Sequence, residues 1–379
     1  MTSTTITRRR FGVALGAAAG AALLEMPLGS PGAEASIPSG VPRDVLQLNS
    51  NENPYGPSPA AREAAVRSLD VAGRYPDAGE DELRSLIART HGVSPDQILF
   101  GCGSGDIIRM AAAAFLGPGR KLVTAEPAFE AVLAYNRVTH AEVVKVPLDA
   151  SFRHDLPRMA AACDAATGLV YVCNPNNPTG TVVTREELAA FLARVPGSAT
   201  VLLDEAYIHF VQDPSASSGL DFLASRLNLV VLRTFSKVYG MAGLRLGYAV
   251  AASEKLDALA RHASFSNVNS AVLAAALTSL ADARRVAEMK RRLNDTRQWL
   301  AGQLAADGRR FIPSEANFLL LDTGRDVAPL IAAFQARQIL VGRKISSMPS
   351  WLRVSVGTPA EMRRFVAVLR ELVPAPAAG

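Results

Sequence analysis

Cysteine and histidine are scarce in this chain of 379 residues, which contains three of the first and five of the second. The cysteines, Cys102, Cys163 and Cys173, are an odd number without metal-like spacing, and the histidines show no paired helical spacing. We therefore expect neither a disulfide nor a bound metal ion. Cys102 and Cys173 lie in motifs at strand ends, where a small apolar packing role is expected.

Strong charge and long hydrophobic runs are also missing. The formal net charge is +5, and three of the positive charges are the adjacent Arg8, Arg9 and Arg10. The remaining excess is mild, which predicts binding to neither nucleic acid nor a membrane surface. With 49% hydrophobic and 20% charged residues, the chain can bury two sizeable cores, as expected for an enzyme of this length.

The N-terminus has the order of an export signal. The three arginines precede Phe11–Leu24, a run of uncharged residues rich in alanine and glycine, and Ala33-Glu34-Ala35 offers a cleavage site. The apolar run is too short to span a bilayer, and paired arginines followed by Phe11 resemble a twin-arginine signal. We expect residues 1–35 to direct export to the periplasm or the medium. The alternatives are a basic extension, or a start codon at Met26 and a cytoplasmic protein.

Lys237 is the first candidate catalytic residue. The stretch Leu229–Thr234 is predicted to be a buried strand, and it leads directly into Ser236 and Lys237. Open α/β sheets bind ligands at the carboxyl ends of their strands, and partial burial there lowers the pKa of an amine and makes it nucleophilic. Ser236 and Arg245 can hold a phosphate beside it. Lys237 is therefore predicted to form a Schiff base with pyridoxal 5′-phosphate. Taken alone, the same local sequence would also fit a lysine that follows a strand and is exposed on the surface.

Two further strands are predicted to end in polar residues that suit this cofactor. Leu169–Val172 runs into a turn containing Asn177, and Thr200–Leu203 ends at Asp204, followed by Tyr207. A carboxylate beside the pyridine nitrogen keeps it protonated, and an amide and a phenol can bond the phenolic oxygen of the ring. Taken singly, Asp204 could instead be a helix N-cap, and the Asn177 segment a plain turn.

These motifs resemble those of the fold-type I pyridoxal-phosphate aminotransferases of class I/II, and within them most closely the histidinol-phosphate aminotransferase group. The resemblance runs from about Leu48 to Val373. Its carriers are the segments Asn51–Gly56, Arg74–Pro76, Asn177–Gly180, Asp204–Tyr207, Ser236–Lys237, Ala242–Arg245 and Leu352–Thr358. Together they are specific for fold and cofactor, and much less so for the substrate.

The resemblance implies a role for each matching residue. Lys237 would be the Schiff-base lysine and proton shuttle, Asp204 would pair with the pyridinium, and Asn177 and Tyr207 would contact the phenolate. The cofactor phosphate would be held by Ser236, Arg245 and the backbone N–H groups of Ser104 and Gly105, near the start of a helix expected close to Asp106. Phe129 would stack on the ring, although core packing is the alternative. Tyr75 would reach the phosphate bound by a neighbouring subunit, which implies a homodimer with shared active sites.

The substrate is less well specified. Arg353 would bind a substrate carboxylate bidentately, with Asn53 and Tyr55 nearby. In histidinol-phosphate enzymes a Val-Arg pair and a later Tyr-Gly precede the segment that Leu352-Arg353 matches. Here Gly342 occupies the position of that arginine, Arg343 is displaced by one residue, and the Tyr-Gly is absent. Arg343 or Lys344 could substitute for it.

The expected fold is α/β, with a large domain built on a mostly parallel sheet and a small α/β C-terminal domain. We expect an N-terminal arm at residues 36–75 that packs with the small domain, a cofactor-binding domain at 76–275 and a small domain at 276–379. The predicted activity is transfer of an amino group between an amino acid, or histidinol phosphate, and a 2-oxo acid. Alternatives on the same scaffold are a lyase similar to threonine-phosphate decarboxylase and a non-catalytic binding protein.

Overall fold

The computed structural model describes residues 44–374, which belong to one compact unit, residues 44–379. Its strands are β1 (Leu46–Leu48), β2 (Ile98–Gly101), β3 (Lys121–Glu126), β4 (Glu142–Pro147), β5 (Thr167–Cys173), β6 (Thr200–Asp204), β7 (Leu229–Thr234), β8 (Gly247–Ala251), β9 (Phe311–Ile312), β10 (Phe318–Asp322), β11 (Ile339–Val341) and β12 (Trp351–Ser355). Its α-helices are α2 (Pro59–Arg67), α3 (Asp77–His91), α4 (Ser104–Phe115), α5 (Ala131–Thr139), α6 (Leu156–Ala161), α7 (Arg185–Arg194), α8 (Ser253–Ala260), α9 (Ser270–Ala281), α10 (Ala283–Ala306), α11 (Ala328–Gln335) and α12 (Pro359–Leu372).

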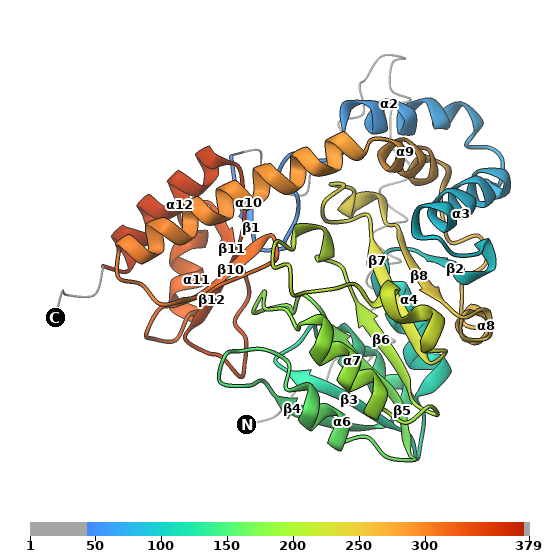
Figure 1. The fold of residues 1–379 in the computed structure, drawn as a ribbon. Coiled ribbons are helices and arrows are strands. Elements are labelled where there is room, and N and C mark those ends of the chain that lie inside the picture. The colour runs from blue at the N-terminus through green and yellow to red at the C-terminus, as the bar shows by residue number, and fades with distance from the viewer. Residues whose placement is uncertain (1–43, 375–379) are drawn as a thin grey trace, which may run out of the picture. The chain divides into compact units, whose positions relative to one another are not determined.

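A seven-stranded sheet in the order β2-β8-β7-β6-β5-β3-β4 forms the larger layer (Figure 1). All neighbouring pairs from β7 to β4 are parallel, and β8 alone runs antiparallel to both of its neighbours. The expectation of a mostly parallel α/β sheet is confirmed. Since β2 is antiparallel to β8, it points the same way as β7, so the carboxyl ends of β2, β5, β6 and β7 share one edge.

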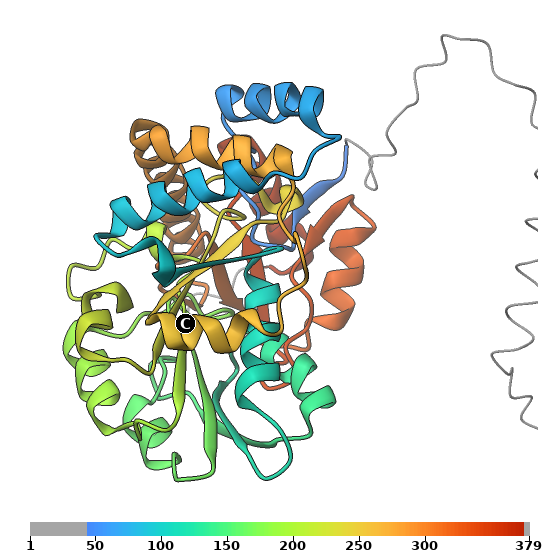
Figure 2. The ribbon, with the colours of Figure 1, turned by 90° about the vertical axis from the view of Figure 1, so that its right-hand side faces the viewer.

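Alternate residues of the central strands build two cores, one on each face of the large sheet. Val170, Val172 and Leu203 pack with α3, α6, α7 and α9, whereas Tyr171 and Leu202 pack with α4, α5 and α8. Figure 2 shows these helices on both faces of the sheet. Near-continuous apolar strands are what a parallel sheet covered on both faces requires.

The last hundred residues form a smaller layer. The antiparallel sheet β12-β10-β9 is covered by α10, α11 and α12, and the short β1 pairs in parallel with β11. The chain leaves the sheet between β9 and β10, because Pro313 lacks an N–H group and the Glu315 N–H donates to Gly180 O at 2.7 Å. Capping boxes at Thr184 and Thr358 start α7 and α12.

The N-terminal segment divides between both layers. Whereas β1 pairs with β11 of the smaller layer, α2 packs on α9 beside the large sheet. Between the two layers in chain order lies the long helix α10, which Asp282 caps by accepting the Arg285 N–H at 2.9 Å. The boundaries at residues 75 and 275 stay predictions.

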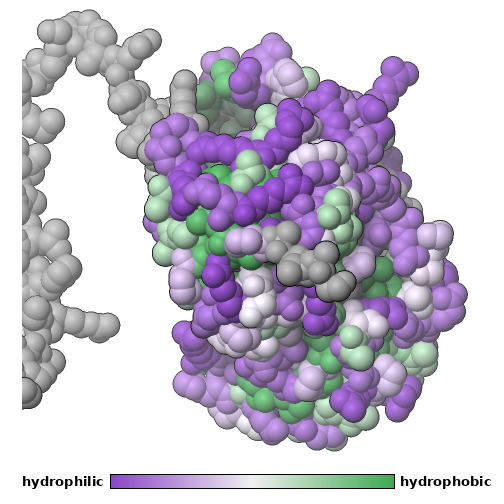
Figure 3. All heavy atoms as spheres, turned by 90° about the vertical axis from the view of Figure 1, so that its left-hand side faces the viewer, coloured by the Kyte–Doolittle hydropathy of each residue, from purple (hydrophilic) through white to green (hydrophobic). Residues whose placement is uncertain are grey.

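On the side of the molecule shown in Figure 3, hydrophilic side chains dominate and hydrophobic ones lie in small separate areas.

Candidate active site

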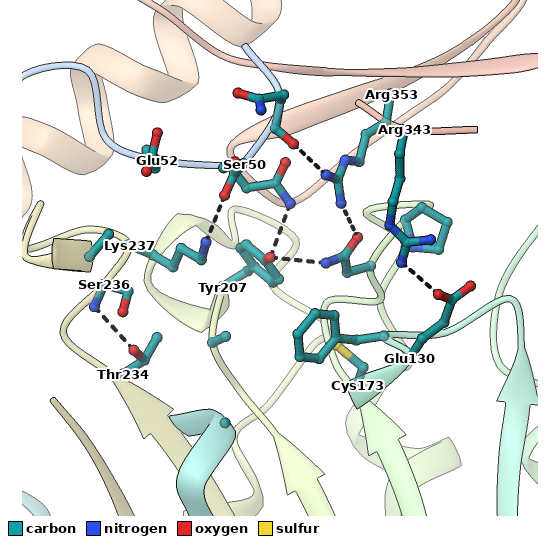
Figure 4. A pocket seen from close by; sticks show the side chains of 18 of the residues that line it. Ser50, Glu52, Glu130, Cys173, Tyr207, Thr234, Ser236, Lys237, Arg343 and Arg353 are labelled. Carbon is teal, nitrogen blue, oxygen red and sulfur yellow. Dashed lines mark hydrogen bonds and ion pairs between the residues drawn. The ribbon is translucent and has the colours of Figure 1, made fainter. Parts of the chain in front are cut away.

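A cavity of about 780 Å³ opens where the carboxyl ends of the large sheet face the smaller layer. Figure 4 shows side chains from both layers pointing into it. From the sequence-predicted set it is lined by Ser104, Gly105, Phe129, Asn177, Asp204, Tyr207, Ser236, Lys237, Arg245, Arg343 and Arg353. The tertiary structure therefore brings together eleven residues that come from segments far apart in the chain.

Lys237 lies three residues beyond the end of β7 and is half-buried. Its Nζ donates a hydrogen bond to Ser50 O at 3.1 Å and lies 5.5 Å from the centre of the Tyr207 ring. Burial, and next the positive charge of Arg353, lower the pKa of this amine to about 8. A sizeable fraction of Lys237 is thus neutral and nucleophilic near pH 8, which an exposed lysine would not be.

Asp204 ends β6 and is 2% exposed. Its Oδ2 accepts a hydrogen bond from the Tyr171 hydroxyl at 2.8 Å, and its Oδ1 accepts one from the Ala206 N–H at 3.0 Å. Burial raises the pKa of this carboxyl to about 6, against the lowering effect of the Tyr171 hydrogen bond. Within the described part of the chain Asp204 has no salt bridge, so a buried carboxylate faces the cavity without a cationic partner.

A chain of hydrogen bonds joins Tyr207 to the smaller layer. The hydroxyl of Tyr207 accepts from Asn177 Nδ2 at 3.2 Å and from Asn51 Nδ2 at 3.0 Å. Asn177 Oδ1 in turn accepts from Arg353 Nη1 at 2.6 Å, while Arg353 Nη2 donates to Asn49 O at 2.7 Å. Burial raises the pKa of Tyr207 and keeps its phenol protonated. Asn177 is held in a turn that ends at Gly180, whose φ of 76° and close approach to Ser314 exclude a side chain.

The start of α4 forms the anion-binding corner of the cavity. Helix α4 begins at Ser104, two residues earlier than expected, and its first N–H groups lie beside the guanidinium of Arg245. A Cβ at Gly103, which has a φ of 78°, would lie 1.9 Å from Arg245 Nη2. Arg245 Nη1 donates to Ser236 Oγ at 3.4 Å and to Ala242 O at 2.8 Å. A helix N-terminus, a hydroxyl and an arginine together suit a phosphate.

At the mouth of the cavity Arg343 Nη2 pairs with Glu130 Oε2 at 2.6 Å. Both side chains are substantially exposed, so this ion pair is weak, but it compensates the charge of Arg343. Phe129, next to Glu130, lies in the wall of the cavity and is 37% exposed.

Three predicted residues lie outside the cavity wall. Asn53 donates from Nδ2 to Val238 O at 2.9 Å, which ties the N-terminal segment to the residue after Lys237. The Tyr55 ring lies under the guanidinium of Arg292 on α10, at 5.3 Å. Tyr75 is 77% exposed on the surface between η1 (Ser68–Val71) and α3. In the part of the chain that the structure describes, none of the three lines the cavity.

The sequence interpretation missed other residues that contribute to the site. Glu52 and Glu130 line the cavity, while Asn51 and Tyr171 donate to Tyr207 and Asp204. Tyr171 is the one polar group among the apolar side chains of Leu169–Val172, a signal that could have been noticed. Asn51 lies in the Asn51–Gly56 motif, but its partner is 156 positions away and no local pattern shows it.

Among residues 44–374, no group of three or more His, Cys, Asp or Glu side chains is arranged to hold a metal ion. Cys102, Cys163 and Cys173 are free thiols. None of the helices in residues 44–374 has the length and apolar character needed to cross a membrane.

The donor set fits pyridoxal 5′-phosphate. Asp204, which is buried and has no salt bridge within residues 44–374, suits a protonated ring nitrogen, and Lys237 has a lowered pKa as aldehyde chemistry requires. Asn177 and Tyr207 would hold the phenolic oxygen, and the Gly103 corner with Ser236 and Arg245 would hold the phosphate, because a side chain at position 103 would fill that space.

Comparisons with known proteins agree with a site for pyridoxal 5′-phosphate. Residues 43–369 match the model of the family described as aminotransferase class I and II. A histidinol-phosphate aminotransferase 2 of Pseudomonas fluorescens is 42% identical over 335 residues, which are 88% of this chain and 90% of that protein. An aromatic amino acid aminotransferase of Cutibacterium acnes is 38% identical over 334 residues, 87% of this chain and 93% of that protein. The crystal structure of histidinol-phosphate aminotransferase from Sinorhizobium meliloti in complex with pyridoxal 5′-phosphate has a TM-score of 0.82 and 26% identity, covering 87% of this chain and 90% of that one.

Proposed function

The chain belongs to the class I and II aminotransferases and is a pyridoxal-phosphate-dependent aminotransferase, and we propose that its amino donor is an amino acid with a free α-carboxylate and an uncharged side chain. This proposal rests on one observation: the two arginines that line the cavity differ in whether an acidic side chain is paired with them. Arg353 keeps donors available beside Lys237, whereas Arg343 is paired with Glu130.

Arg353 is suited to a carboxylate. A guanidinium has five N–H donors, and two of them bond Asn177 and Asn49 within residues 44–374, which leaves three for a ligand. Those two bonds fix the plane of the guanidinium before a substrate arrives. A pre-oriented arginine binds a carboxylate at two points and loses little side-chain entropy in doing so.

The apolar part of the cavity lining favours an uncharged side chain. Phe129, Ile331, Leu340 and Ile345 belong to this lining, and the cation Arg343 is paired with Glu130. Because Glu130 already compensates the charge of Arg343, an acidic group on the donor would gain less from that cation. Aromatic and aliphatic amino acids meet no such competition, because apolar surfaces associate without a specific partner.

The roles of the side chains follow from their positions. When bound, pyridoxal phosphate supplies an aldehyde that takes up the amino group and a protonated ring that accepts electrons. Asp204 would keep the ring nitrogen protonated, and Asn177 and Tyr207 would hold the phenolic oxygen. The neutral Lys237 amine would bind the cofactor, and its Nζ would act as the general base that takes the proton from the substrate Cα. Arg353 holds the carboxylate so that this proton lies near Nζ.

Histidinol phosphate is the second candidate donor, and two observations favour it. A relative that is 42% identical carries that name, and Arg343 and Lys344 stand near the position of the arginine that histidinol-phosphate enzymes use. For this donor Glu130 would have to release Arg343, and Arg353 would bind the phosphate in place of a carboxylate.

A single-turnover experiment separates the two donors. The purified, cofactor-loaded protein is mixed with phenylalanine, leucine, glutamate or histidinol phosphate, and conversion of the cofactor to its amine form is followed by absorbance. Fast conversion by phenylalanine or leucine, with slow conversion by glutamate and histidinol phosphate, is the expected result. Fast conversion by histidinol phosphate alone would overturn the proposed donor. Release of CO₂ without the amine form would indicate a lyase, and no conversion with any donor would favour a binding protein.

We also propose a homodimer in which Tyr75 completes the partner's phosphate site. Large exposed hydrophobic side chains gather near Tyr75, namely Val66, Leu69 and Val71 on α2 and η1, each about 60% exposed. Burial of this surface by a second copy of the chain would explain why these apolar side chains are exposed in the single chain. Sedimentation should give twice the chain mass, and Tyr75→Phe should weaken cofactor affinity several-fold without changing the mass. A monomer with full activity would contradict the proposal.

We further propose that the N-terminus exports the protein, as Arg8–Arg10 and the apolar run Phe11–Leu24 favour. These residues lie outside the part of the chain that the structure describes. A fusion of residues 1–40 to a reporter that folds before export should reach the periplasm, and replacement of Arg8 and Arg9 by lysine should retain it inside the cell. Retention of the unaltered fusion would support a cytoplasmic enzyme.

A further inference from the structure

Tyr171 is fully buried in the middle of β5, where the neighbouring strand positions are apolar. Its side chain lies in the core between the large sheet and α4, together with Leu169, Leu202 and Leu232. The hydroxyl donates to Asp204 Oδ2 at 2.8 Å, and this is its one hydrogen bond within residues 44–374.

A phenol hydroxyl at this depth costs free energy unless it is hydrogen-bonded. Phenylalanine would fill the same volume without that cost, so the carboxylate is what makes a tyrosine stable here. Tyr171 and the Ala206 N–H each occupy one oxygen of Asp204, at 2.8 Å and 3.0 Å. With both oxygens held, the plane of the carboxylate is fixed.

The other ionisable groups around Asp204 do not replace this donor. Glu205 accepts from Arg233 Nε and Nη2 at 3.0 Å and 2.9 Å, so its charge is compensated locally. Burial raises the pKa values of Cys173 and Tyr207, which keeps both neutral. Lys237 favours the charged carboxylate, but only as a smaller influence than the Tyr171 hydrogen bond.

We propose that Tyr171 is a positioning residue that fixes the Asp204 carboxylate and keeps it ionised for the ring nitrogen of the cofactor. The inference rests on the proposed role of Asp204, and it adds a residue that never touches the cofactor. Without the hydroxyl, Asp204 would take up a proton at a higher pH and would lose its value as an anionic partner.

The first test compares the full chain, freed of cofactor, with Tyr171→Phe at pH 5 and pH 8. Burial raises the pKa of Asp204 above its ordinary value, so the folded state holds its proton more tightly and stability falls as pH rises through about 6. Removing the hydroxyl raises the pKa further, so the variant should lose more stability at pH 8 than at pH 5. We expect about a tenfold difference in the unfolding equilibrium constant, equivalent to about one pKa unit.

Matched variants separate this effect from simple loss of packing. Tyr239→Phe removes another phenol hydroxyl, one that makes no hydrogen bond to Asp204 within residues 44–374, and it should destabilise the protein equally at both pH values. In an Asp204→Asn background, Tyr171→Phe should also lose its pH dependence. An equal loss at pH 5 and pH 8 in the natural background would overturn the proposal.

The second test measures the dissociation constant of pyridoxal 5′-phosphate at pH 8. Tyr171→Phe should raise it about tenfold, and Tyr239→Phe should leave it within about twofold of the unaltered protein. If the pH-dependent stability difference appears but the dissociation constant does not change, Asp204 does not hold the ring nitrogen and the proposal falls. Failure of every amino donor would contradict the proposed function, but it would leave both of these results intact.

Discussion

Arg353 Nη1 donates a 2.6 Å hydrogen bond to Asn177 Oδ1, which joins β12 of the smaller layer to the turn that follows β5 of the large sheet. Asn177 in turn donates to the Tyr207 hydroxyl. The group proposed to receive the substrate carboxylate is therefore positioned by a residue proposed to contact the cofactor. Both ligands are oriented by one continuous network that spans the two layers (Figure 4).

Replacing Lys237 with alanine should abolish transamination and shift the absorbance of bound pyridoxal phosphate to that of the free aldehyde, because the nucleophilic amine is lost. Lys255→Ala is the matched control. Lys255 is also partly buried with a lowered pKa, but it lies on α8 outside the cavity. Absorbance spectra and turnover are the measurements. Survival of both properties in Lys237→Ala would show that the site assignment is wrong.

The rate at which cofactor-free protein captures pyridoxal phosphate should rise with pH around a midpoint of about 8, because burial lowers the pKa of Lys237 to that value and only the neutral amine reacts. The charge of Arg353 contributes to the lowering, so Arg353→Gln should move the midpoint upward. Glu52 acts in the opposite direction, and Glu52→Gln should move it downward. Stopped-flow absorbance gives the profile, and a midpoint near 10 would contradict the assignment.

Arg353→Gln should reduce kcat/KM for phenylalanine about a hundredfold, since truncating one partner of a buried charge pair costs about 2–5 kcal/mol. Arg337→Gln, which breaks the exposed pair with Glu371, should have little effect. Steady-state kinetics with phenylalanine and histidinol phosphate make the comparison. A loss with phenylalanine as small as that of Arg337→Gln would argue against recognition of its carboxylate by Arg353.

Glu130→Gln should release Arg343 and improve kcat/KM for glutamate relative to leucine by about two- to fivefold, the range expected for an exposed ion pair. Glu126→Gln breaks a similar exposed pair with Lys145 outside the cavity and should leave the ratio unchanged. If Glu130→Gln leaves the ratio unchanged as well, the Glu130 pair does not select the donor.

Gly103→Ala should weaken pyridoxal-phosphate binding by about tenfold or more, because the new Cβ would lie 1.9 Å from Arg245 Nη2 and the backbone has a φ of 78°. Gly105→Ala is the control. Its Cβ would meet nothing closer than 3.9 Å, and the N–H group is retained. Cofactor titration by fluorescence measures both. Similar losses in the two variants would place the phosphate elsewhere.

The sequence by itself determined the strands that lead to Asn177, Asp204 and Lys237, because uninterrupted apolar runs followed by turn residues are a local signal. It also identified Arg245, Arg353 and Phe129 as site residues through motifs. These depend on residue type and spacing within short segments, and both are visible without coordinates.

The tertiary structure decided which of these residues meet. Asn177 and Arg353 are 176 positions apart, and Glu130 and Arg343 are 213 apart. No local pattern encodes such a pairing, because it depends on how the smaller layer packs against the edge of the large sheet. The same holds for Tyr171, whose hydroxyl can bond Asp204 only because β5 and β6 lie side by side in the sheet. The lowered pKa of Lys237 likewise arises from burial, a property of the folded chain and not of the motif.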